Sequence, residues 1–151
     1  MLGGRNSSRF VKEASIAAAQ DITDACGAEW DAHQSDCGGF ARAVAVWPGV
    51  TSSGMANDIV GEIAAAPWSP VDGGPAAADQ VAQGRLAIAG LNGADQQEPD
   101  VHGHVVVVVE GASARGLYPT AYWGQVGGGG KRDATLNWAW RAGGRDHAVY
   151  G

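Results

Sequence analysis

The segments Asp36-Cys37-Gly38-Gly39-Phe40 and His102-Gly103-His104, the second of which leads into a run of valines over residues 105–109, decide the fold of this chain. The first segment opens a stretch whose apolar residues recur at spacings of three and four: Cys37, Phe40, Ala41 and Val44. That spacing predicts a helix with one buried face. The valine run predicts a central strand that is covered on both faces. A thiol therefore starts a helix, and an imidazole starts a buried strand.

Helical patterns dominate the first half of the chain, and strand patterns dominate the second half. The predicted helices run from Ser7 or Ser8 to about Trp30, from Cys37 to Pro48-Gly49, over residues 55–66 and over residues 76–83. Further strands are expected at residues 85–90, 118–124, 136–141 and 147–150, with a flexible turn at 127–130. Helices followed by strands predict an α+β domain.

Length and composition predict one folded domain over residues 1–151, with residues 1–8 frayed. Apolar residues make up 45% of the chain and charged residues 17%, which excludes a disordered protein. The net charge of −6 argues against a nucleic-acid binder. No apolar run approaches the ~20 residues of a membrane span, and no export signal is visible. We expect synthesis in the cytoplasm without a leader.

The charge is unevenly distributed along the chain. Residues 1–110 hold five basic and fourteen acidic side chains, a net charge of −9, whereas residues 111–151 carry +3. Arg132 and Arg141 are candidates to contact a substrate carboxylate, although a solvated basic face explains the same pattern. Tyr122 and Trp123 are candidates to line a groove.

Cys37 is the candidate nucleophile. Unpaired N–H groups at a helix start favour negative charge, so we expect the thiol pKa to fall from ~8.5 toward 3.5–7.5. The N–H groups of Cys37 and Gly38 are candidates to stabilise the oxyanion of a tetrahedral intermediate. The alternative is that Cys37 is a small buried hydrophobic residue.

His104 is the candidate general base, because a neutral imidazole at the strand start can accept the thiol proton and return it to a leaving amine. This chemistry requires no cofactor and no metal. Two alternatives remain open. His104 can cap a loop, or Asp100, His102 and His104 can share one strand face and bind a metal in a metal-dependent hydrolase.

The residues Asp36 to Ala41, with His104-Val105 opening a later strand, resemble the NlpC-like branch of papain-fold peptidases, which are bacterial cell-wall amidases. The match is closer to one subgroup, the first family of type VI secretion amidase effectors. It extends over roughly residues 22–126, with order and spacing kept. The resemblance implies a papain-like α+β fold with N-terminal helices packed on an antiparallel sheet.

The resemblance also implies an activity. It implies cleavage of the bond between γ-D-glutamyl and meso-diaminopimelate in peptidoglycan stem peptides, with Cys37 as nucleophile and His104 as base. It further implies injection into the periplasm of a rival bacterium and inhibition by a cognate immunity protein; we expect a monomer. The rival interpretation is a papain-like module that binds wall fragments or a partner without hydrolysis.

Two positions depart from the family pattern. The residue after the cysteine is usually serine, where this chain has Gly38. The third catalytic position falls near Trp123, whose indole cannot accept a hydrogen bond from imidazole. Two candidates are then left to orient His104: the main-chain carbonyl of Trp123, or another residue that the sequence does not identify.

Overall fold

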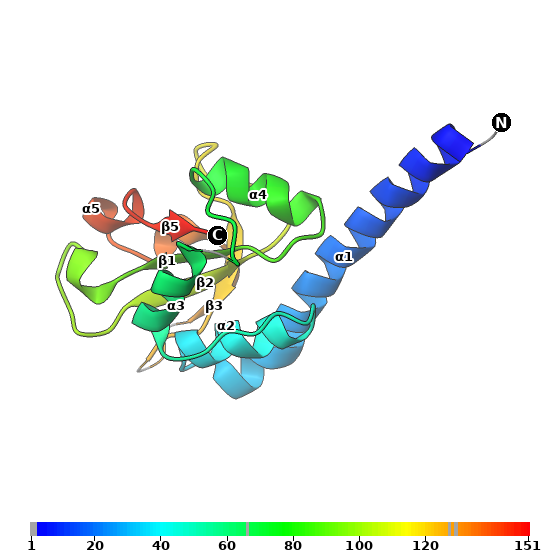
Figure 1. Cartoon of the computed structure of the whole chain (residues 1–151). Coiled ribbons are helices and arrows are strands. Elements are labelled where there is room, and N and C mark those ends of the chain that lie inside the picture. The colour runs from blue at the N-terminus through cyan, green and yellow to red at the C-terminus, as the bar shows by residue number, and fades with distance from the viewer. Residues whose placement is uncertain (1–2, 66, 127, 129) are drawn as a thin grey trace.

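Helices pack against a five-stranded antiparallel sheet in the computed structural model of this protein (Figure 1). The structure describes residues 3–65, 67–126, 128 and 130–151. The helices are α1 (Gly3–His33), α2 (Cys37–Val46), α3 (Ala56–Ile63), α4 (Gly74–Ala82) and the short α5 (Ala142–Arg145). The strands are β1 (Ile88–Leu91), β2 (His104–Val108), β3 (Thr120–Trp123), β4 (Lys131–Thr135) and β5 (Val149–Tyr150). The α+β prediction is confirmed.

The helix starts and ends follow local sequence signals with small shifts. Asp36 precedes α2 in extended conformation, and its side chain caps the helix. Proline in the first turn of α4 suits a helix start, because proline lacks the N–H that would be unpaired there. α1 begins at Gly3 rather than at Ser7 or Ser8, and its first half projects beyond the sheet (Figure 1). Residues 1 and 2 of the segment expected to be frayed lie outside the described residues.

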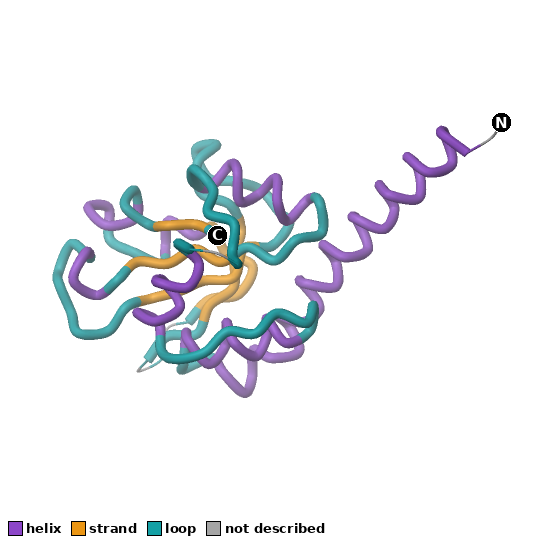
Figure 2. Tube along the Cα trace, in the orientation of Figure 1, coloured by secondary structure: helices purple, strands orange, loops and turns teal. Residues whose placement is uncertain are grey.

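β2 is the central strand of the sheet, whose order is β4-β3-β2-β1-β5 (Figure 2). All five residues of β2 are buried, as the unbroken valine run predicts. Its side chains alternate between the two faces. Val105 and Val107 pack in one core cluster with Phe40 of α2, and Val106 and Val108 pack in the other. His104 is therefore in register with the face of Val106 and Val108.

One predicted strand is wrong. Residues 136–141 do not form a strand, because Leu136–Trp138 is the 3-10 helix η2. The apolar residues alternate there because Leu136 and Trp140 of this turn are buried in the core, while Trp138 between them is 70% exposed. The strand in this part of the chain is β4, which ends immediately before η2. Its first residues are charged and exposed, so the sequence there shows no alternation of apolar residues. In the turn predicted at 127–130, residues 127 and 129 lie outside the described residues.

Among the residues that the structure describes, no helix combines the length and apolar character that a membrane crossing requires.

Candidate active site

Cys37 is the first residue of α2, and its position depends on a tight helix cap. The N–H of Gly39 donates to the Asp36 carboxylate at 3.0 Å, which satisfies one of the unpaired donors of the first turn. A side chain at position 39 would collide with that carboxylate, so only glycine permits this close approach. The cap holds Cys37 against the sheet, where its side chain is 6% exposed.

The sulfur of Cys37 lies against the main chain on both sides of His104. The thiol points to the carbonyl oxygen of Gly103, with Sγ 4.0 Å from it. Burial raises the pKa of the Cys37 thiol, while N–H groups of Val105, Gly38 and Cys37 lower it in part. The expectation of a lowered thiol pKa is therefore wrong for the resting protein, because desolvation outweighs the helix start.

His104 begins β2, and its ring lies between two indoles. Its centroid is 6.3 Å from that of Trp123 and 5.7 Å from that of Trp140, both in edge-to-face geometry. Burial lowers the pKa of His104 to about 4, so the imidazole is neutral at pH 7. Its Nε2 atom is buried and has no hydrogen-bond partner.

Cys37 and His104 meet at the start of β2, but their side chains approach it from opposite faces of the sheet. Cys37 belongs to the cluster of Val105 and Val107, whereas the neighbours of His104, Trp123 and Trp140, belong to the other cluster. No hydrogen bond joins the two side chains in the described part of the chain. The resting pair is thus a buried thiol and a neutral imidazole, adjacent along one strand end and not hydrogen-bonded.

A hollow of about 470 Å³ opens at Cys37. Its lining comes from four segments that are distant in sequence: Asp36, Cys37, Gly38 and Arg42 from α2 and its cap, Met55, Ala56, Asn57 and Asp58 from the start of α3, Val101, His102 and Gly103 from the loop before β2, and Val126 from the loop after β3. Asn57 ties α3 to the loop before β2. Its amide accepts from the N–H of Gly93 at 3.0 Å and donates to the carbonyl of Val101 at 2.9 Å. Sequence reasoning gave Asn57 no such role, because both partners are remote in the chain.

The other predicted site residues are dispersed. Tyr122 is half-buried against the cluster that contains Cys37 but does not line the hollow. Arg132 is exposed on β4, and Arg141 forms a 2.8 Å ion pair with Glu98 at a second hollow.

Trp123 contacts the ring of His104 with its own ring, and no hydrogen bond links the imidazole to the main-chain carbonyl of Trp123. Trp140, the nearer indole, was not predicted, since nothing in its local sequence indicates a histidine neighbour.

The proposed metal-binding strand face does not form. β2 begins at His104, whereas Asp100 and His102 lie in the preceding loop, where both are exposed. The carboxylate of Asp100 accepts the N–H of His102 within that loop. No group of three or more His, Cys, Asp or Glu side chains that could hold a metal ion occurs among the described residues. Cys26 and Cys37 are both free.

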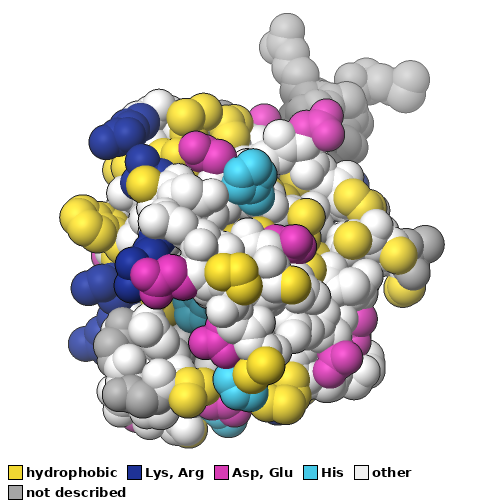
Figure 3. Space-filling model, turned by 90° about the vertical axis from the view of Figure 1, so that its left-hand side faces the viewer, with side chains coloured by type: hydrophobic (Ala, Val, Ile, Leu, Met, Phe, Trp, Pro, Cys, Tyr) yellow, Lys and Arg dark blue, Asp and Glu magenta, His cyan; other side chains and the backbone are white. Residues whose placement is uncertain are grey.

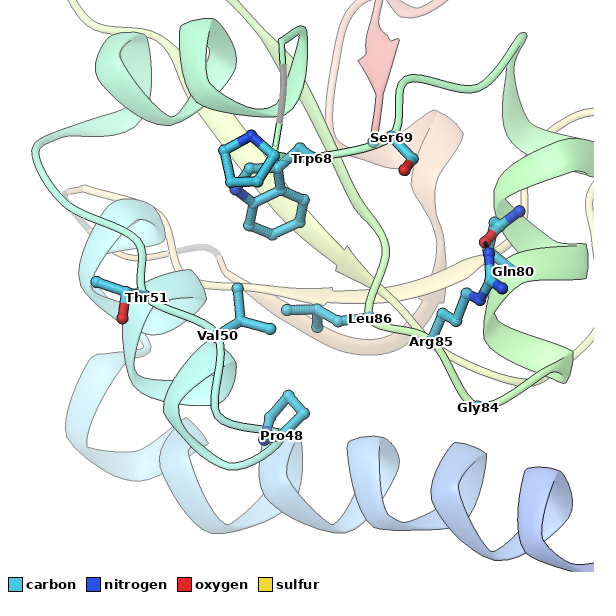
Figure 4. Close-up of a pocket in the computed structure, with 11 residues that line it drawn as sticks. Pro48, Val50, Thr51, Trp68, Ser69, Gln80, Gly84, Arg85 and Leu86 are labelled. Carbon is cyan, nitrogen blue, oxygen red and sulfur yellow. Dashed lines mark hydrogen bonds between the residues drawn. The ribbon is translucent and has the colours of Figure 1, made fainter.

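A larger hollow of about 580 Å³ lies away from Cys37, between the loop after α2 and the end of α4 (Figure 4). Val50, Trp68 and Leu86 form much of its wall, and Arg85 donates to Gln80 at one end. None of the predicted site residues lines it. Size alone therefore does not identify the reactive centre of this molecule.

Helices that pack on a five-stranded antiparallel sheet match the papain-like amidase fold. No family model matches the chain. The chain is 35% identical over 117 residues to "Peptidoglycan amidase Tse1" of Pseudomonas aeruginosa, a match that covers 72% of this chain and 71% of that protein. The chain therefore belongs to the family of Tse1, the amidase-effector family expected from its sequence.

Proposed function

We propose that this protein is a peptidoglycan amidase that cleaves the γ-D-glutamyl–meso-diaminopimelate bond of stem peptides by cysteine catalysis. The observation that carries the proposal is the position of the Cys37 sulfur, in a hollow and against the main chain that flanks His104. The family relationship supports peptidoglycan as the substrate. The same relationship supports action as an antibacterial effector in the periplasm of a target cell. We further propose that a cognate immunity protein opposes it.

The reaction begins when Sγ of Cys37 attacks the acyl carbon of the γ-D-glutamyl group and its proton passes to the neutral imidazole of His104. The N–H groups of Cys37 and Gly38 bind the resulting oxyanion. His104 then gives the proton to the leaving amine of diaminopimelate, and the C–N bond breaks. Water, deprotonated by His104, attacks the thioester and releases the glutamyl carboxylate and the free thiol.

Activation in this scheme occurs when substrate arrives. A buried thiol and a neutral imidazole are a resting state without charge separation, and catalytic hydrogen bonds often tighten only in the complex with substrate. Cys37 already lies against the main chain of both neighbours of His104, so in this scheme substrate binding brings the imidazole and the sulfur together. Trp123 and Trp140 hold the imidazole on its buried side.

Mass spectrometry of digested sacculi tests this proposal, because it names the bond that is cut. The native protein should release fragments that end in γ-D-glutamate, and Cys37→Ala should reduce their rate of formation by at least about a thousand-fold. Cys26→Ala is the matched control. Cys26 is fully buried and outside the hollow, so its loss should change stability more than turnover. Products cut at another bond, or turnover by Cys37→Ala, would contradict the proposal.

A non-catalytic binding module remains the second candidate, and one observation favours it. The two side chains of the pair are not hydrogen-bonded, and the thiol pKa is raised. A binder would retain sacculus fragments without releasing any product. Co-sedimentation of the native protein with sacculi, scored together with product release, separates the two candidates.

A further inference from the structure

A second, polar hollow of about 370 Å³ lies beside the candidate active site. It is lined from four short segments: Gln96, Gln97, Glu98 and Asp100, then Gln125, then Trp138, Ala139, Trp140 and Arg141, and finally Gly144. Two of these segments continue directly into the hollow at Cys37, which is lined by Val101 and Val126. Trp140 also contacts the ring of His104. The two hollows therefore flank the same loop and the same histidine.

Trp138 gives this hollow an exposed aromatic surface. The residue ends the 3-10 helix η2 and is 70% exposed, although its neighbours Leu136 and Trp140 anchor the turn in the core. An indole face carries partial negative charge and attracts polarised C–H groups. The C–H face of a pyranose ring is such a group, so a fixed and exposed indole beside polar side chains is suited to stack on a sugar.

Two glutamine amides at the hollow are fixed by the protein and keep one polar end each for a ligand. Gln97 accepts the N–H of Gly143 through Oε1 at 2.8 Å, which leaves its Nε2 donor available. Gln96 donates from Nε2 to the carbonyl of His102 at 3.1 Å, which leaves its Oε1 acceptor available. A donor and an acceptor held in this way match sugar hydroxyl and acetamido groups, which both donate and accept.

The side chains that line this hollow carry a small excess of negative charge, because Asp100 adds a carboxylate to the pair of Glu98 and Arg141. Glu98 and Arg141 form a 2.8 Å ion pair, so the guanidinium already has an anionic partner. Figure 3 shows the side of the molecule that lies on the left of Figure 1, on which Lys and Arg side chains gather along one edge while Asp and Glu side chains are spread over the face. A hollow whose arginine is already paired and which carries a further carboxylate favours a neutral polar ligand over a free carboxylate.

From these four observations we propose that this hollow binds an N-acetylated sugar of the glycan strand, stacked on Trp138 and hydrogen-bonded by Gln96 and Gln97. The inference rests on the proposed function, because it supplies the sugar to which the stem peptide is attached. A lactyl group, an alanine and the side chain of the glutamyl residue separate that sugar from the reacting γ-carbonyl carbon, a span of roughly 12–14 Å when extended. The two hollows adjoin at residues 100–101 and 125–126, an arrangement compatible with that span.

Two substrates that share one scissile bond test this inference: a disaccharide-tetrapeptide and the same tetrapeptide without sugar. The native protein should cleave the sugar-bearing substrate with the higher kcat/KM. Trp138→Ala should lower that preference about ten-fold, and Trp138→Tyr should restore part of it. Trp47→Ala is the matched control, since Trp47 is also exposed, at 56%, but lines neither hollow.

A binding measurement keeps the inference separate from catalysis. In the Cys37→Ala variant, a chitin tetramer should quench tryptophan fluorescence, and the additional change Trp138→Ala should abolish the quenching. Equal losses on both substrates, or a tetramer that does not bind, would overturn the sugar site. If neither substrate is cleaved but the tetramer still binds through Trp138, the proposed function fails and the sugar site stands.

Discussion

The Sγ atom of Cys37 lies 4.0 Å from the carbonyl oxygen of Gly103, the residue immediately before His104. The helix start is therefore docked on the main chain of β2, and the thiol is largely withdrawn from water. Burial then has opposite effects on the two groups, because it disfavours the charged form of each: the pKa of the Cys37 thiol rises and that of the His104 imidazole falls. Both groups are uncharged at neutral pH before substrate binds.

Alkylation should report this uncharged resting state. Because the pKa of the Cys37 thiol is raised, its rate of reaction with iodoacetamide should continue to increase through pH about 8.5, the ordinary thiol value. Mass spectrometry of the labelled peptide against pH measures the rate, and Cys37→Ala identifies any signal from Cys26. A rate that is already maximal near pH 7 would demonstrate a preformed thiolate instead.

His104 should make the protein less stable in mild acid. Its pKa is about 4 in the folded state and about 6.5 when unfolded, so between these values the unfolded chain binds more protons. The free energy of unfolding should therefore decrease as the pH falls from about 6.5 to 4, by on the order of 3 kcal/mol. Urea titrations at several pH values measure it.

Two histidine variants separate this effect from general acid sensitivity. His104→Asn should remove the decrease, because it removes the titrating group. His102→Asn should leave it in place, because His102 is exposed in the neighbouring loop. An equal pH dependence in all three proteins would assign the acid sensitivity to other groups.

Asp36 has two roles that substitutions can separate. Its side chain caps α2, and its charge raises the pKa of the Cys37 thiol. Asp36→Asn should keep most of the cap while shifting the alkylation profile of Cys37 to lower pH. Asp36→Ala should shift the profile in the same direction and also reduce the free energy of unfolding by about 1 kcal/mol. Identical stability in the two variants would show that the cap contributes nothing.

Adjacent glycines in the first turn of α2 should respond differently to alanine. A Cβ atom at position 38 would make ordinary contacts, the nearest at 3.4 Å from the backbone nitrogen of Ala56. Gly38→Ala should therefore be neutral, or stabilise the protein by about 0.4–1 kcal/mol by restricting the unfolded chain. Gly39→Ala should destabilise it by about 1 kcal/mol, because the new side chain displaces the Asp36 cap. Thermal unfolding of the two variants side by side gives the comparison.

Much of the fold followed from local patterns. The apolar stripe after Asp36 predicted α2, and the valine run predicted β2, because each element buries residues that are close together in the chain. β4 was missed because it carries exposed charges and has no apolar pattern. The strand predicted over 136–141 was wrong. The buried Leu136 and Trp140 lie on either side of the exposed Trp138, and this alternation of buried and exposed residues is also the pattern of a strand.

The amino-acid sequence by itself determined that a thiol begins a helix and that an imidazole begins a buried strand, since both depend on neighbours within a few residues. Tertiary structure decided everything that depends on distant segments. It placed Cys37 against Gly103, enclosed His104 with Trp123 and Trp140, and set both pKa directions. The physical reason is desolvation, which depends on how the whole chain packs around a group and not on the residues beside it.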